Sequence, residues 1–259
     1  MAMIGQPVLV RTPLPIARSI RWKPIADRYY LLGNLLGHRA DDFVLFVAQP
    51  VLIDVQRQLR DSRDGTVRGL LCGYVGQCRT TDIHYSVVTS AVAATAPERG
   101  AAAEVEREEQ VLERLCVEAA EAGETVLGWY RSRPKVGTQL AAGDAFICKE
   151  YFSSPWQTVL VVTPDGNGGF FQYKRQAARN YCIPFHELGA PDNTQNRGPR
   201  GTTIGWRAYE SSDVVKLLPE RERDALVAAA RSFGNGGPPS LKARMMANLQ
   251  RRVRWMKGE

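Results

Sequence analysis

An apolar run that ends at Tyr130 and is followed by two arginines predicts a strand over residues 125–132. Successive side chains of a strand point to opposite faces, so Tyr130 lies on one face while Arg131 and Arg133 share the other. A buried guanidinium without a partner costs several kcal/mol, so both arginines need water, an anion or a carboxylate beside them. Asp144, just beyond the following loop, is the candidate carboxylate.

Strands and helices are predicted to alternate on both sides of this strand. β-Branched and small apolar residues favour strands, whereas a spaced apolar stripe with glutamates in its first turns favours a helix. Asp144 or a neighbour is expected to cap the last helix. The predicted strands cover 43–47, 66–76, 82–93, 158–162 and 170–173, and the predicted helices cover the segment from Pro50 to about 61, 104–122 and 142–152.

Composition shifts divide the chain into three predicted parts. Residues 1–41 mix prolines with short apolar pieces, which indicates an extended arm that gains order by lying on something else. Residues 42–180 form the predicted compact domain. Residues 181–259 form a linker and helical extension, with a Gly-, Pro- and Asn-rich loop at 187–203. Two helices are predicted in this last part, one over 219–233 and one over the basic tail 241–259.

The bulk composition is that of an ordinary globular protein with a basic balance. Of the 259 residues 44% are hydrophobic, and the net charge is +7, which favours acidic partners or nucleic acid without specifying either. Five cysteines without paired spacing predict reduced, buried thiols in a cytoplasmic protein. No apolar run of about 18 residues occurs, so no membrane span is predicted. His38, His84 and His186 share no metal-ligand spacing.

The stretch around residue 130 resembles the JAMM (MPN, or Mov34) domain, a zinc isopeptidase fold. The family signature reads Gly-Trp-(Tyr/Ile)-His-x-His-Pro, followed after a short loop by Ser-x-x-Asp. The residues in register with it are Gly128, Trp129, Tyr130, Ser132, Pro134, Gly137, Leu140 and Asp144. The resemblance covers roughly 43–175 and implies an α/β fold, a mixed sheet of the cytidine-deaminase-like kind flanked by helices, here with an N-terminal arm and a C-terminal helical extension.

The residues that carry the family's chemistry are almost all replaced. Arg131 and Arg133 occupy the two histidine positions, Ala141 occupies the serine position, and Thr66 occupies the position of the catalytic glutamate. Arginine has no lone pair for a metal, and a zinc isopeptidase site needs imidazole and carboxylate ligands plus a general base. Only Asp144 remains. The resemblance therefore predicts no metal, no cofactor and no isopeptidase activity.

Two guanidiniums at the histidine positions would bring the same formal charge as the missing zinc ion. We therefore hypothesise that Arg131 or Arg133 pairs with Asp144 and holds the vacated pocket together. In the alternative, both arginines point into solvent.

The resemblance implies a pseudo-isopeptidase that acts as a scaffold or interaction subunit of a heteromeric assembly. Inactive members of the family pair with an active JAMM protein or help to position a ubiquitin-like protein, and family members assemble through C-terminal helices. The alternative is a nucleic-acid or ribonucleoprotein component that uses a basic surface. The candidate binding residues for either role are Arg131, Arg133, Lys135, Asp144, Arg244, Arg251, Arg252 and Arg254.

Overall fold

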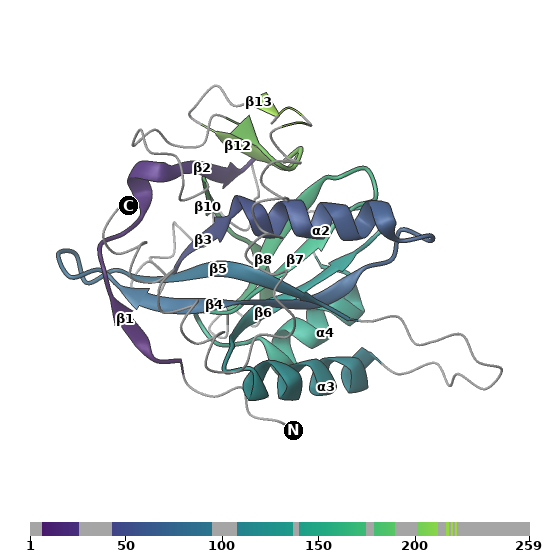
Figure 1. Cartoon of the computed structure of the whole chain (residues 1–259), viewed down its shortest axis with the longest axis horizontal. Coiled ribbons are helices and arrows are strands. Elements are labelled where there is room, and N and C mark those ends of the chain that lie inside the picture. The colour runs from purple at the N-terminus through teal and green to yellow at the C-terminus, as the bar shows by residue number, and fades with distance from the viewer. Residues whose placement is uncertain are drawn as a thin grey trace.

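A curled mixed sheet with helices on both faces forms the centre of the protein in the computed structural model (Figure 1). The structure describes residues 7–25, 43–94, 108–136, 140–174, 179–189, 201–211, 216–217, 219 and 221. Within these residues, eleven strands join one sheet in the order β12-β2-β10-β3-β5-β4-β6-β7-β8-β9, with β1 paired to β4. The predicted α/β fold class is thereby confirmed.

The strands of this sheet are β1 (Leu9–Arg11), β2 (Ser19–Pro24), β3 (Val44–Ala48), β4 (Arg68–Gln77), β5 (His84–Ala93), β6 (Thr125–Ser132), β7 (Thr158–Val162), β8 (Gly168–Lys174), β9 (Arg179–Cys182), β10 (Phe185–Leu188) and β12 (Tyr209–Ser211). The helices are a 3-10 turn (Ile16–Arg18), α2 (Gln49–Asp61), α3 (Glu108–Glu121) and α4 (Ala142–Tyr151). A separate pair joins β11 (Gly201–Thr202) to β13 (Lys216–Leu217).

The helices cover the sheet from both sides. Helix α2 lies on one face, where the hydroxyl of Tyr130 donates a hydrogen bond to Gln58, whereas α3 and α4 lie on the other face (Figure 1). Pro50 suits the first turn of α2 because that position needs no backbone donor. Leucine and valine side chains of α2 and α3, such as Leu52 and Leu112, are fully buried, and each such burial stabilises by about 1.5–3 kcal/mol.

The element order predicted between residues 43 and 174 is confirmed. Strand β6 has the predicted bounds, and α2, α4 and β7 lie within one or two residues of theirs. The predicted cap of α4 is wrong. Ala141 occupies the cap position without a side-chain hydrogen bond, and Asp144 lies in the first turn with its carboxylate turned to other partners. All five cysteines are buried, as expected for structural thiols.

Strand pairing crosses both boundaries of the three-part division, which itself stays a prediction. Strand β1 pairs in parallel with β4, and β2 pairs antiparallel with β10 and β12. Strand β10 also pairs in parallel with β3. The predicted loop at 187–203 is wrong at both ends, because residues 187 and 188 belong to β10 and residues 201 and 202 form β11. The helix predicted over 219–233 and the tail 241–259 lie almost wholly outside the described residues.

Glu187 on β10 joins these distant segments. Its side chain has no exposed surface, and its carboxylate accepts hydrogen bonds only from neutral groups among the described residues. The donors are Trp22 Nε1 (3.1 Å), Gln49 Nε2 (3.1 Å), Thr202 Oγ1 (2.6 Å), Thr203 N (2.9 Å), Thr203 Oγ1 (3.2 Å) and Trp206 Nε1 (3.2 Å). A buried carboxylate is stable only when its oxygens are saturated in this way. These hydrogen bonds therefore hold Trp22 of β2, the start of α2 and residues 202–206 against β10.

None of the helices in the described residues is long and apolar enough to cross a membrane.

Candidate functional site

The end of β6 presents two arginines to the face of the sheet that α3 and α4 cover. Tyr130 and Ser132 are buried toward the opposite face, as the strand alternation predicts. The side chain of Arg131 is 14% exposed and that of Arg133 is 31% exposed. Both charges therefore lie partly out of water and need a counter-charge.

Asp144 supplies that counter-charge from the first turn of α4, with a side chain only 1% exposed. Arg133 binds it through two nitrogens, with Nε 2.9 Å from Oδ2 and Nη2 2.8 Å from Oδ1. Arg131 Nη1 lies 3.2 Å from Oδ1. The predicted ion pair is confirmed, and both arginines take part. The hydrogen bond from Arg133 to Asp144 raises the pKa of Arg133 above its ordinary value.

Two further charged residues belong to the site and were missed in the sequence. Arg131 Nη1 also donates to Oε1 of Glu108, the first residue of α3. Arg68 at the start of β4 lies directly opposite Arg131 in the antiparallel register, so the two side chains share a face. No described carboxylate pairs with Arg68. The sequence near Glu108 and Arg68 does not indicate that either residue belongs to the site, because their positions depend on how distant segments pack.

The other described residues of the predicted site do not enter the hydrogen bonds of this cluster. Thr66 is exposed in the turn before β4, where its N–H donates to Oδ1 of Asp64 at 2.9 Å. Ala141 and Lys135 are exposed. The basic residues of the tail, Arg244, Arg251, Arg252 and Arg254, lie outside the described residues. Of the predicted site residues that the structure describes, the geometry thus joins Arg131, Arg133 and Asp144 by hydrogen bonds and leaves Thr66, Lys135 and Ala141 outside this network.

Comparison with known proteins shows which protein family the segment around the cluster resembles. Residues 45–153 match the model of the JAB1/Mov34/MPN/PAD-1 ubiquitin protease family. These residues form a JAB/MPN domain. Among curated proteins no match to the chain is found. Two solution structures are similar to this chain: a protein from Desulfitobacterium hafniense, with 14% sequence identity, and a protein from Salinibacter ruber, with 16%. Each match covers 57% of this chain and 92% of the other protein's chain, with a TM-score of 0.36.

The matched segment begins inside β3 and ends after α4, so it contains every residue of the cluster. Strands β7 to β10 and β12 continue its sheet beyond the matched segment, and β1 and β2 join it from the N-terminal side. The chain therefore builds a larger sheet around the family's segment than the match itself covers.

The donor set at the family's metal position does not fit zinc. Zinc sites use neutral imidazoles, thiolates and carboxylates, whereas a guanidinium carries no free lone pair and stays protonated. Both oxygens of Asp144 are engaged by guanidinium nitrogens, and two positive charges lie where a dication would have to sit. Across the described residues, no three His, Cys, Asp or Glu side chains gather into a metal-binding group.

The two described histidines are held in aromatic surroundings. The ring of His84 lies 5.3 Å from that of Phe43, and the ring of His186 lies 4.8 Å from that of Phe46. Burial lowers the pKa of His186 to about 4, and its Nδ1 lies 2.8 Å from the hydroxyl of Ser19. His38 lies outside the described residues.

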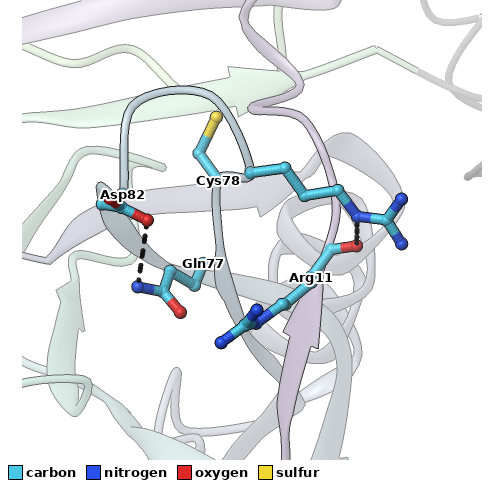
Figure 2. A pocket seen from close by; sticks show the side chains of 5 residues that line it. Arg11, Gln77, Cys78 and Asp82 are labelled. Atoms are coloured by element: carbon cyan, nitrogen blue, oxygen red, sulfur yellow. Dashed lines mark hydrogen bonds between the residues drawn. The ribbon is translucent and has the colours of Figure 1, made fainter.

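A hollow of about 410 Å³ lies beside the last residue of β4, Gln77, at the opposite end of that strand from Arg68. It is lined by Arg11, Gln77, Cys78, Arg79 and Asp82. Arg79 Nε donates to the backbone carbonyl of Arg11, and the sulfur of Cys78 points away from the side chains of Arg11 and Gln77 (Figure 2). The hydrogen bond with the Thr80 hydroxyl lowers the pKa of the Cys78 thiol to about 6. No histidine is among the described residues that line the hollow.

Proposed function

We propose that the JAB/MPN domain of this chain is catalytically inactive and acts as an interaction subunit of a multiprotein assembly. The observation that carries the proposal is the capture of Asp144 by Arg131 and Arg133. In a zinc isopeptidase this carboxylate helps to hold the metal. Here the ion pairs occupy its oxygens and supply the positive charge that a metal would bring.

The other replacements act in the same direction. Metal-assisted hydrolysis needs a carboxylate base that takes a proton from the attacking water. Thr66 stands at that position, and a threonine hydroxyl cannot accept a proton from water at neutral pH. Ala141 lacks the hydroxyl of the family's serine. Restoring one residue alone would therefore not restore hydrolysis.

The ion-pair cluster has a structural role that suits an interaction subunit. Through Arg131 and Arg133 it ties the start of α3 and the start of α4 to the end of β6. The domain can thus keep the shape of the family without a metal. Its partner is proposed to be a protein, such as an active JAB/MPN protein or a ubiquitin-like protein.

Two measurements on the full-length chain test this proposal. Ubiquitin chains incubated with the zinc-supplemented protein should remain uncleaved, and cleavage that is lost in Asp144→Asn would overturn the inactive assignment. A tagged pull-down from the native host, treated with nuclease and analysed by mass spectrometry, should retain a protein partner. Loss of all partners on nuclease treatment would instead assign the protein to nucleic-acid binding and contradict the proposed role.

A further inference from the structure

Positive charge exceeds negative charge in the cluster that replaces the metal. Arg68, Arg131 and Arg133, here called the arginine triad, share one face at the ends of β4 and β6. Only Asp144 and Glu108 oppose them among the described residues, which leaves a net charge of +1. Neighbouring like charges in a partly buried site are destabilising unless an anion completes the site.

The hydrogen bonds of Arg131 show the same shortage of acceptors. A single nitrogen, Nη1, serves both Glu108 and Asp144. Its Nε atom is buried and has no hydrogen-bond partner among the described residues. Buried donors of this kind are rare in folded proteins, and each one calls for an acceptor. Arg68, opposite Arg131, likewise has no described carboxylate beside it.

The two acids of the cluster are held unequally. Asp144 is 1% exposed and uses both oxygens, so it belongs to the core of the site. Glu108 is 25% exposed and reaches Arg131 through one oxygen only. A partly exposed carboxylate held through one oxygen contributes less free energy than a buried one held through both, and another carboxylate can replace it. Glu108 is therefore the exchangeable partner.

The start of α4, beside the triad, consists of small and exposed residues. Ala141, Ala142 and Gly143 are exposed and carry little or no side chain. A Cβ built on Gly143 would lie 4.0 Å from Nη2 of Arg133, so the glycine leaves room directly beside that guanidinium. The first N–H groups of α4 have no side-chain cap at Ala141, and their partial positive charge also favours an anion.

We propose that the arginine triad binds a carboxylate of a protein partner, and that this carboxylate displaces Glu108 from Arg131. The inference rests on the proposed inactive role of the domain and names the chemistry by which its vacated site recognises a partner. A planar carboxylate matches the fork of a guanidinium, so Arg68 can give it paired hydrogen bonds while Arg131 Nη1, released from Glu108, donates one more. Asp144 stays in place and keeps the site assembled.

The binding test uses the full-length protein and short peptides of defined charge. N-acetylated tetra-alanine with a free C-terminal carboxylate is titrated while the arginine Nε–H signals are followed by NMR, and the same peptide with a C-terminal amide is the control. A third peptide, amidated and containing one glutamate, distinguishes a side-chain carboxylate from a chain end. A dissociation constant of about 1 mM is expected for a few charge-assisted hydrogen bonds, with no binding of the uncharged amide.

Three variants separate this role from a purely structural one. Arg68→Ala should weaken carboxylate binding about tenfold because it removes charge-assisted hydrogen bonds. Glu108→Gln should strengthen binding about threefold because it removes the internal competitor, a gain that loss of structure cannot produce. Arg207→Ala, which removes an exposed arginine that pairs with Asp165, is the matched control and should leave binding unchanged.

Three results would overturn the inference: equal binding of the acid and amide peptides, no binding of either carboxylate peptide, or weaker binding in Glu108→Gln. Preferential binding of inorganic phosphate over both carboxylate peptides would also overturn it and would assign the triad to phosphate. None of these results bears on ubiquitin-chain cleavage. A failure here is therefore distinguishable from a failure of the inactive assignment.

Discussion

Replacing Asp144 by asparagine should destabilise the fold well beyond an ordinary surface substitution. The carboxylate is almost fully buried and accepts three guanidinium hydrogen bonds, at 2.8, 2.9 and 3.2 Å. Asparagine keeps the size of the side chain but removes the negative charge and one acceptor oxygen. Arg131 and Arg133 would then face each other with only Glu108 to balance them.

The magnitude follows from the burial of the three groups. Breaking a fully buried ion pair from one side costs about 3–5 kcal/mol, because the remaining charge is left unpaired. The partial exposure of Arg131 and Arg133 reduces this penalty, since water reaches both guanidiniums. We therefore expect a loss of about 2–3 kcal/mol in the free energy of unfolding. For a chain of this size that corresponds to a Tm lower by about 4–12 °C.

Urea unfolding of the full-length protein, followed by circular dichroism, measures this loss directly. Glu118→Gln serves as the control because Glu118 is half exposed and pairs with Arg114 within α3. Its expected change is below about 0.5 kcal/mol. A loss in Asp144→Asn no larger than that of the control would refute the reasoning, because it would mean that the cluster contributes nothing to holding α4 on the sheet.

Three further predictions concern other parts of the structure. Glu187→Gln should lower the free energy of unfolding by about 3–5 kcal/mol, because an amide nitrogen would face three of the six donors; a urea midpoint equal to that of wild type would contradict this. Burial lowers the pKa of His186 to about 4 in the folded protein. Between that pH and about 6.5 the imidazole is protonated in the unfolded state but not in the folded state. The free energy of unfolding should therefore fall as the pH decreases from about 6.5 to about 4, by at most about 3 kcal/mol. His186→Gln should flatten this pH dependence in urea midpoints, and an unchanged slope would argue against it. Gly128→Ala should prevent normal pairing of β6 with β7, because its Cβ would lie 1.9 Å from the carbonyl oxygen of Thr158; a soluble variant with wild-type thermal stability would disprove the close approach.

Local sequence pattern predicts much of the segment from 43 to 174. The apolar run into Tyr130 predicted the bounds of β6, and the spaced apolar positions predicted α2 and the described part of α3. The pairing of Arg131 and Arg133 with Asp144 was also predictable, because two guanidiniums on one strand face need a nearby carboxylate. These features depend on residues that lie close together in the chain.

The features that escaped prediction depend on long-range packing. Glu187 lies in a short Phe-His-Glu-Leu segment whose pattern does not reveal a fully buried carboxylate. Its donors come from residues 22, 49 and 202–206, which only the folded sheet brings together. Arg68 and Glu108 were also missed, because only the strand register and the docking of α3 place them beside Arg131. The side chain of Asp144 looked like a helix cap but satisfies the two arginines instead.

The central claim is that Arg131 and Arg133 occupy the place of a metal on Asp144. Its most direct test is the zinc affinity of the full-length protein, measured by competition with a chromogenic chelator, for wild type and for Arg131→His/Arg133→His. The account predicts no zinc site in wild type that depends on Asp144, and a one-to-one site in the double variant that is lost when Asp144→Asn is added. Stoichiometric zinc in wild type, released by Asp144→Asn, would contradict it.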